Sequence, residues 1–325
     1  MLLLDAKDMD GLLDIERSIG ELRSALSEQA NGQVQMPARQ TTDTQDGQNW
    51  LRISSAFLNG SGFMGFKAMN RAAGLGMRYM VGLYKIETGE LLSVMDANWL
   101  TTRRTAATSA IGTDLMAPKS ETTVGIIGSG VQARAFIQAY STLRKLENII
   151  VFSPREESRS AFAEWIKNQL GIPAVAAADP ETVGRQCATT VLAMRAPRQP
   201  VFMSKWLRPG SHVTGLSSVR PEAREIDDDV WSKSDLVVVD DRGTVFQSGD
   251  GRSVAAKGID AASIPELWEL AAGKVSRSSE DQISLFKSSG NAMQDIAVAI
   301  GVYKLAVEQN KGRSIDHFPE VKPYD

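Results

Sequence analysis

The segment Val124–Phe136 reads VGIIGSGVQARAF: a short apolar run, two closely spaced glycines and an alanine-rich stretch. Gly128, Gly130 and Ala133 fit the spacing G-x-G-x-x-A, placed where a strand ends and a helix begins. The first glycine permits a tight turn, the second lets a pyrophosphate approach the backbone, and the alanine allows close helix–strand packing. The free N–H groups of the helix N-terminus favour an anion. The segment predicts a dinucleotide-binding turn; a glycine-rich turn without a ligand is the alternative.

Strands and helices alternate after this turn. A helix is predicted from Val131 to about Lys145, then a strand over NIIVF (Asn148–Phe152), then a helix from about Glu156 to Leu170. Further apolar runs lie at Cys187–Ala193, His212–Leu216 and Leu236–Val239. This alternation is typical of a parallel sheet with helices on both faces. We therefore expect a doubly wound α/β domain of the Rossmann type over residues 119–295.

The residues before the turn predict a smaller α+β domain. Between residues 8 and 28, leucine and isoleucine recur every three or four positions, which is the apolar face of a helix. Two β-rich runs within Tyr79–Asp96 flank a glycine-containing turn and predict a hairpin. A helix rich in small residues is expected to begin after Asn98 as its N-cap and to stop at Pro118. Residues 1–118 are assigned to this domain.

The end of the chain predicts one long helix. From Asn291 the apolar residues follow a period near 3.6 until about Gly312. We expect this helix to leave the nucleotide-binding domain and return to the first one. Residues from about 296 to 325 would then complete the first domain.

Composition limits the possible functions. The chain has 325 residues, of which 42% are hydrophobic and 23% charged, values typical of a folded protein of about two domains. A net charge of −3 gives no electrostatic reason to expect a nucleic-acid partner. No apolar stretch approaches the roughly 18 residues of a membrane span, and the short N-terminal apolar run is followed by acids, unlike a signal peptide. We expect a cytoplasmic protein without a membrane partner.

Cysteine and histidine are scarce. Cys187 is the single cysteine, so an intramolecular disulfide is excluded. With only His212 and His317 beside it, a His/Cys zinc site is not expected.

The end of the second predicted strand bears on the choice of cofactor. It reads VFSPR, with Ser153 where an acid would hold the ribose hydroxyls of NAD, and with Arg155 close behind. No acid would repel a 2′-phosphate there and the arginine could pair with it, which favours NADP(H) over NAD(H). The alternative is that Arg155 is a solvated residue of the first helical turn. The predicted cofactor contacts are Gly128, Ser129, Gly130, Val131, Gln132, Ser153 and Arg155.

Several segments resemble the ornithine cyclodeaminase/mu-crystallin family. They are RTAATSA (Arg104–Ala110), GSGVQA (Gly128–Ala133), REID (Arg224–Asp227), IPELWELAAGK (Ile264–Lys274) and LFKSSGNAMQDIAVA (Leu285–Ala299). The resemblance covers most of residues 93–310. It implies a Rossmann domain inserted into a substrate and dimerisation domain, hence a homodimer, and hydride exchange at the α-carbon of a small amino or imino acid.

The same resemblance assigns roles to individual side chains. Arg104 would clamp a substrate carboxylate, for which arginine is suited because it forms two parallel charged hydrogen bonds. Lys67 in GFKAMN would hold the carboxylate or protonate the developing amine. Arg39 would be a further carboxylate-binding arginine. A surface salt bridge for Arg104, an edge-strand lysine for Lys67 and a solvated loop residue for Arg39 are the alternatives. Lys287 and Ser288 would approach the nicotinamide.

Ornithine cyclodeaminase itself uses two acids that this sequence lacks. Its catalytic aspartate belongs to a loop that reads GLSSVRPEAREID here, with Val219 at the aspartate position. No glutamate lies between Arg39 and Lys67. Ser217 or Ser218 could offer a hydroxyl instead. These departures favour an NAD(P)H-dependent reductase or dehydrogenase acting on a small imino, keto or amino acid. A cyclodeaminase with bound NAD and a non-catalytic NADPH-dependent binding protein resembling mu-crystallin are the alternatives.

Overall fold

The computed structural model describes residues 1–195, 197–216, 220–316 and 318–322. The chain divides into two compact units: unit 1 comprises Met1–Arg104 and Asn291–Asp325, and unit 2 comprises Thr105–Gly290. The division falls inside helix α3 (Ala97–Met116), whereas the predicted boundary after residue 118 lies just beyond the end of that helix.

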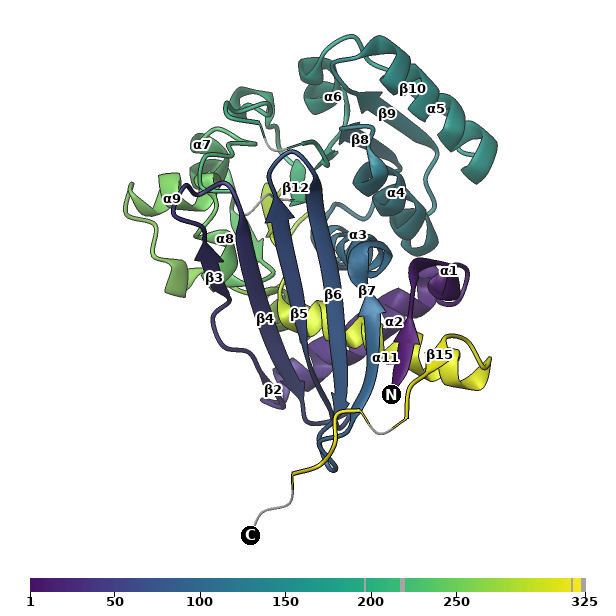
Figure 1. The fold of residues 1–325 in the computed structure, drawn as a ribbon. Helices are drawn as coiled ribbons and strands as arrows, with labels where there is room; N and C mark the ends of the chain where they lie inside the picture. Colours follow the sequence, from purple (N-terminus) through teal and green to yellow (C-terminus); the bar gives the residue numbers. More distant parts are fainter. Residues whose placement is uncertain (196, 217–219, 317, 323–325) are drawn as a thin grey trace. The chain divides into compact units, whose positions relative to one another are not determined.

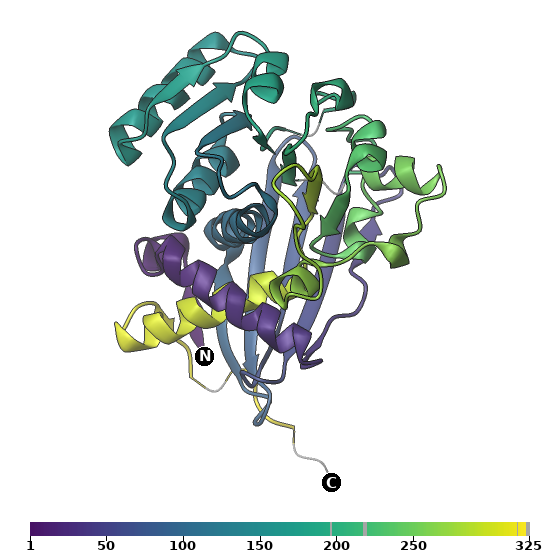
Figure 2. The same ribbon diagram turned by 180° about the vertical axis from the view of Figure 1, so that it is seen from behind.

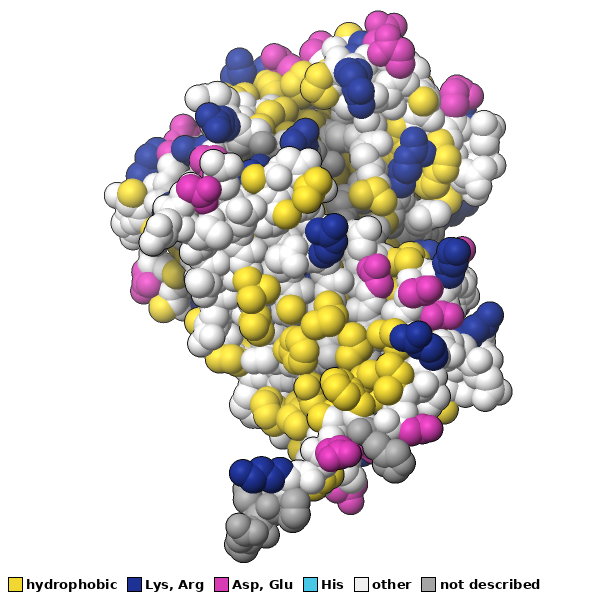
Figure 3. Space-filling view, viewed as in Figure 1, with side chains coloured by type: hydrophobic (Ala, Val, Ile, Leu, Met, Phe, Trp, Pro, Cys, Tyr) yellow, Lys and Arg dark blue, Asp and Glu magenta, His cyan; other side chains and the backbone are white. Residues whose placement is uncertain are grey.

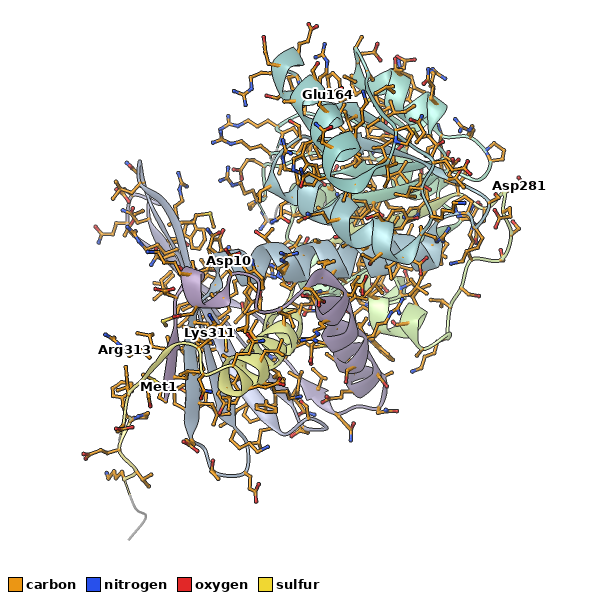
Figure 4. The ribbon with its side chains drawn as sticks, turned by 90° about the vertical axis from the view of Figure 1, so that its right-hand side faces the viewer. Met1, Asp10, Glu164, Asp281, Lys311 and Arg313 are labelled. Carbon is orange, nitrogen blue, oxygen red and sulfur yellow. The ribbon has the colours of Figure 1, made fainter. Side chains whose placement is uncertain are left out.

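Unit 1 is built on a mixed sheet of eight strands among the described residues, in the order β15-β1-β7-β6-β5-β4-β2 with β3 paired to β4 (Figure 1). The hairpin predicted over Tyr79–Asp96 is present as the antiparallel pair β6 and β7. Met1 and Arg313 lie side by side at one sheet edge (Figure 4), where β1 pairs with β15. The strands are β1 (Leu2–Leu4), β2 (Val34–Gln35), β3 (Gln40–Asp43), β4 (Trp50–Leu58), β5 (Phe63–Ala72), β6 (Gly76–Lys85), β7 (Leu91–Asp96) and β15 (Arg313–Ser314).

Two long helices, α2 (Ile15–Ala30) and α11 (Ala292–Glu308), cover one face of this sheet (Figure 2). The amphipathic helix predicted over residues 8–28 is present as α2, but its predicted start is wrong, because a short α1 (Ala6–Met9) ends before Gly11, which takes a positive φ. Asp14 then caps α2 by accepting a hydrogen bond from the Arg17 N–H. The break turns the chain while the apolar face of α2 stays buried.

The predicted N-cap of α3 is also wrong. The helix already includes Asn98, and the side chain of Asp96 accepts the Asn98 N–H at 2.9 Å. The carboxylate thus satisfies a free N–H of the first helical turn, as an N-terminal acid does. The helix ends at Met116, as Pro118 predicts.

Gly65 allows α11 to approach β5 closely. A Cβ on Gly65 would lie 2.6 Å from Cδ1 of Ile296 on α11 and 2.5 Å from the carbonyl oxygen of Gly82 on β6. Any larger residue would therefore push the helix off the sheet. Because Gly65 and Lys67 point to the same sheet face, this contact also brings the first turns of α11 to Lys67.

Unit 2 is a seven-stranded parallel sheet among the described residues, in the order β10-β9-β8-β11-β12-β14-β13. Strand β8 (Thr123–Ile127) lies between β9 on one side and β11 on the other. The strands that directly follow β8 in the chain, β9 and β10, extend the sheet in one direction, and the later strands extend it in the other. The strand order therefore reverses at β8. The fold-class prediction, a doubly wound parallel sheet joined to an α+β domain, is confirmed. The other elements are α4 (Val131–Leu143), β9 (Asn148–Phe152), α5 (Glu156–Leu170), β10 (Ala174–Ala176), α6 (Pro180–Gln186), β11 (Thr189–Leu192), β12 (His212–Leu216), α7 (Asp229–Lys233), β13 (Leu236–Val239), α8 (Arg242–Val245), α9 (Gly249–Ala255), α10 (Leu267–Ala271) and β14 (Ser284–Ser288), with single 3₁₀ turns at Ser204–Trp206 and Ala261–Ser263.

Within the described residues, every helix is too short or too polar to cross a lipid bilayer.

Candidate active site

Three charged side chains from distant parts of the sequence meet in unit 1. Lys67 comes from β5, Arg104 from α3 and Asp295 from the first turn of α11. The Lys67 Nζ donates to Oδ1 of Asp295 at 2.9 Å, and the Arg104 Nε donates to the same oxygen at 3.0 Å. One carboxylate oxygen therefore orients both cations. We call Lys67, Arg104 and Asp295 the cationic cluster.

Neutral groups fix the remaining geometry of the cluster. Lys67 Nζ also donates to the hydroxyl of Thr101 at 2.8 Å, and Nη1 of Arg104 donates to the side-chain oxygen of Gln294 at 3.1 Å. The ring of Tyr79 lies beside Lys67, with its centroid 5.1 Å from Nζ. Two cations thus share one carboxylate, which leaves an excess positive charge suited to an incoming anion.

Burial lowers the pKa of Lys67 within this cluster. Lys67, Arg104 and Asp295 are almost fully buried. Desolvation lowers the pKa of Lys67 from 10.5 to about 8, against the attraction of Asp295 and helped by the repulsion of Arg104 and Arg39. The ammonium can therefore lose or regain a proton near neutral pH.

Arg39 lies close enough to Lys67 to affect its pKa. It directly precedes β3 and is partly buried. The structure thus places Arg39, Lys67 and Arg104 in the same unit, with the last two on one carboxylate. Their contact with a substrate stays a prediction.

The sequence predicts for Asp295 only that it caps or orients the start of the C-terminal helix, and Asp295 is not among the predicted site residues. Its pairing with both Lys67 and Arg104 is a finding of the structure. A signal was present: Asp295 is an acid in the first turn of an otherwise apolar helix, and a carboxylate buried there requires a cationic partner. The neighbouring Gln294 gave no comparable signal, because its amide could equally have been solvated.

The glycine-rich turn of unit 2 has the geometry that its sequence predicts. Gly128 has a φ of 128°, and a Cβ there would lie 2.2 Å from the carbonyl oxygen of Ala193. Gly130 is the N-cap residue of α4 and has extended backbone, with no side-chain cap. A Cβ on Gly130 would meet nothing within 4 Å. The first glycine is therefore required by the fold, while the second leaves open space at a helix N-terminus.

Two further features of this turn fit a dinucleotide. The side-chain oxygen of Gln132 is buried and has no hydrogen-bond partner within the described residues. Val131 is an apolar residue with 64% of its surface exposed at the first position of α4. Both observations are consistent with a ligand that covers this end of the helix.

The end of β9 carries hydroxyl and guanidinium groups. The Ser129 hydroxyl donates to that of Ser153 at 3.0 Å, which ties the glycine turn to the end of β9. Arg155 is exposed. Arg159 lies further along α5, and its Nη1 donates to the carbonyl of Ser153 at 3.1 Å. Positions 153–155, which directly follow β9, thus contain no acidic residue.

Lys287 and Ser288 have partners inside unit 2. Nζ of Lys287 is fully buried and donates to Glu225 at 2.6 Å and to Asp250 at 2.9 Å. The Ser288 hydroxyl donates to Asp240 at 2.8 Å. These side chains stabilise the carboxyl end of β14, and their predicted contact with the cofactor stays a prediction.

Four residues named in the sequence analysis lie outside the described residues. They are Ser217, Ser218 and Val219 of the loop after β12, together with His317.

Comparison with known proteins places these features in a family. The sequence profile of the ornithine cyclodeaminase/mu-crystallin family matches residues 1–310. A Delta(1)-pyrroline-2-carboxylate reductase of Bacillus cereus is 29% identical over 326 residues, which cover 97% of this chain and 100% of that protein. The ketimine reductase mu-crystallin of Mus musculus is 28% identical over 221 residues, or 68% of this chain and 67% of that protein.

A solved structure extends the likeness to the fold. The Delta(1)-pyrroline-2-carboxylate reductase of Thermococcus litoralis, in complex with NADH and L-proline, is 30% identical with a TM-score of 0.90 and covers 97% of this chain and 100% of that one. An archaeal alanine dehydrogenase dimer with bound NAD is 28% identical, also with a TM-score of 0.90, and covers 98% and 99%. The predicted resemblance is confirmed.

Proposed function

This chain belongs to the ornithine cyclodeaminase/mu-crystallin family, and from that premise we propose that it is an NAD(P)H-dependent reductase of small imino acids. The reaction adds a hydride to the carbon and a proton to the nitrogen of a C=N bond, which yields an amino acid. The similar proteins include reductases of pyrroline-2-carboxylate and of ketimines, so the activity class predicted from the sequence is theirs.

The observation that carries the proposal is the sharing of one Asp295 oxygen by Lys67 and Arg104. The shared carboxylate presets both cations before a substrate arrives, so little entropy is lost when they bind an α-carboxylate. Lys67, with a pKa of about 8, can also supply the proton that the amine nitrogen needs. The cofactor, bound at the glycine turn of unit 2, supplies the hydride.

We further propose that NADP(H) is preferred over NAD(H). Arg155 and Arg159 lie beyond the end of β9, where a 2′-phosphate would need positive charge. Ser153 offers a hydroxyl there and no repelling carboxylate. NADH and NAD are the cofactors named for two of the similar structures, so the preference must be tested for this chain.

The test is a spectrophotometric screen of cofactor oxidation. NADPH and NADH are each offered with cyclic imino acids, and with 2-oxo acids plus ammonium. Net oxidation of NADPH faster than of NADH is expected for at least one imine. Ammonia release from a diamino acid without net cofactor turnover would identify a cyclodeaminase. Tight NADPH binding without turnover of any imine would indicate a binding protein.

The pKa of Lys67 predicts the pH profile of the reductase. The value of kcat/KM should fall above pH 8, approaching a tenfold loss per pH unit, as Lys67 loses its proton. Between pH 8 and 10.5 the unfolded chain binds more protons at this site, so Lys67 adds to the free energy of unfolding as pH rises. The deprotonation of Lys67 thus stabilises the fold over this pH range, so the expected fall in kcat/KM cannot be caused by unfolding at this site.

Asp295→Asn is the matched variant for this profile. It removes the carboxylate that raises the pKa of Lys67, and the inflection should move to lower pH. An inflection that stays in place, or a wild-type profile that is flat beyond pH 9, would contradict the role of Lys67.

We also propose that the protein is a homodimer formed through the open face of the unit 1 sheet. Hydrophobic side chains gather over this face (Figure 3), opposite to the one that α2 and α11 cover. Leu51, Ile53 and Phe57 alternate along β4 with 48%, 44% and 42% of their surfaces exposed. A second copy is the favoured occupant, because exposed apolar side chains gathered on one face mark an interaction surface and a similar alanine dehydrogenase is a dimer.

Phe57→Glu should convert the dimer to a monomer. The charge would be buried without a partner in the middle of the apolar contact, which is strongly unfavourable. Light scattering should give the mass of one chain, 35.3 kDa, for the variant and twice that for the wild type. Val307→Glu, at an apolar and exposed position on α11, is the control and should remain dimeric. A monomeric wild type would refute the proposal.

A further inference from the structure

Arg52 lies on the same sheet face as the cationic cluster. In the antiparallel pair of β4 and β5, Ser54 stands opposite Lys67 and Arg52 stands opposite Met69. Because residues two apart on a strand point to one face, Arg52 and Lys67 are diagonal neighbours. Such neighbours have Cβ atoms roughly 7–8 Å apart, within reach of long side chains.

Two contacts fix the direction of the Arg52 guanidinium. Its Nε donates to the hydroxyl of Thr41 on β3 at 2.9 Å. Its central carbon lies 5.0 Å from the centroid of the Trp50 ring, a cation–π geometry. The side chain is thus held at the end of the sheet face before any ligand binds.

One end of this guanidinium lacks a partner. Nη1 of Arg52 is buried and donates no hydrogen bond to any group within the described residues. Among the residues that the structure describes, Arg52 also forms no ion pair. Burial lowers the pKa of Arg52, and the attraction of Asp43 opposes this shift. A buried cationic donor without a partner is costly, so a ligand that supplies an anionic acceptor would bind there favourably.

We propose that Arg52 binds a second carboxylate of the substrate, at the end opposite to the α-carboxylate held by Lys67 and Arg104. The preferred substrates are then imines of short 2-oxodicarboxylic acids, such as the imine of 2-oxoglutarate. This inference rests on the proposed function, because it names the substrate class of the same site. Arginine suits the role, since its planar fork matches a carboxylate with two hydrogen bonds.

The experiment compares two ligands that differ in the second carboxylate. The binding of 2-oxoglutarate and of 2-oxopentanoate is measured by calorimetry on the enzyme saturated with NADP⁺, where no reduction can occur. The wild type should bind 2-oxoglutarate at least tenfold more tightly. Arg52→Met should weaken 2-oxoglutarate roughly ten- to hundredfold and leave 2-oxopentanoate unchanged. Arg52→Lys should retain part of the preference.

Arg71→Met is the matched control. Arg71 lies on β5 opposite Trp50, on the same face as Arg52, but its side chain is exposed. This variant removes the same charge from the same sheet and should keep the preference for the dicarboxylate. If Arg71→Met and Arg52→Met had equal effects, the general positive charge of the face would be responsible and the inference would fail.

Two further outcomes would show that Arg52 does not bind a second substrate carboxylate. Equal affinities of the wild type for the two ligands, or a loss of both ligands in Arg52→Met, would overturn the inference. The loss of both would mean that Arg52 only supports β3 and β4. The proposed function is decided separately, because oxidation of NADPH with cyclic imino acids does not require a second carboxylate.

Discussion

Arg104→Met should lower kcat/KM for an imino acid by about a thousandfold, while the affinity for NADPH stays at the wild-type value. The loss corresponds to two charged hydrogen bonds to the α-carboxylate, each of about 1.5–3 kcal/mol. Folding should persist, because Lys67 still neutralises Asp295 when the guanidinium is gone. Methionine fills much of the arginine volume without charge. Steady-state kinetics and NADPH fluorescence titration measure the two quantities.

Arg103→Met is the control for this variant. Arg103 precedes Arg104 on α3 and points about 100° away around the helix, where its guanidinium lies over the ring of Trp99 at 5.2 Å. Its replacement should change kcat/KM by less than a few fold. A comparable loss in both variants, or a loss of NADPH binding in Arg104→Met, would contradict the assignment of Arg104 to the substrate.

Gly130→Asp should weaken NADPH binding by at least a hundredfold without lowering the melting temperature of the cofactor-free protein. Aspartate is a favoured N-cap residue, the backbone at Gly130 suits any L-residue, and a Cβ there meets nothing within 4 Å. The same carboxylate would lie where the pyrophosphate approaches, and like charges in contact cost several kcal/mol. Calorimetric titration and thermal unfolding give the two readouts.

Gly130→Asn and Gly128→Ala complete this test. Asparagine has the size of aspartate without its charge, so Gly130→Asn should lose less affinity than Gly130→Asp. Gly128→Ala should instead destabilise unit 2, because its Cβ would overlap the carbonyl of Ala193 and its φ of 128° strains an L-residue. If Gly130→Asp bound NADPH normally, the turn would not be a pyrophosphate site.

The glycine-rich turn was predictable because its chemistry is local. Gly128, Gly130 and Ala133 act within one strand–turn–helix segment, so their spacing in sequence is their arrangement in space. The helices that follow, α4 and α5, begin where their sequences indicated. The break between α1 and α2 was missed because the apolar spacing continues across it, while Gly11 and Asp14 interrupt the backbone.

The cationic cluster was only half predictable, because it joins residues that are far apart along the chain. Lys67 and Arg104 were found through family resemblance, but Asp295 follows Lys67 by 228 positions. No periodicity links such residues. The orphaned donor of Arg52 was equally hidden, because an arginine on a strand does not reveal which of its nitrogens lacks a partner until the neighbouring strands are placed.

The discontinuity of unit 1 has a consequence for the order of events during biosynthesis. The ribosome delivers strands β1 to β7 first, then all of unit 2, and only at the end the helix that bears Asp295 and the short edge strand β15. Until that last segment emerges, Val81 and Leu83 on the inner side of β6 lack the cover of α11, and Lys67 and Arg104 lack the carboxylate of Asp295 that they share in the complete chain. A nascent chain thus completes its inserted portion before the surrounding one. The cationic cluster is therefore completed only when synthesis is nearly finished, and a chain that stops before residue 295 would lack the cover that α11 gives to β4, β5 and β6.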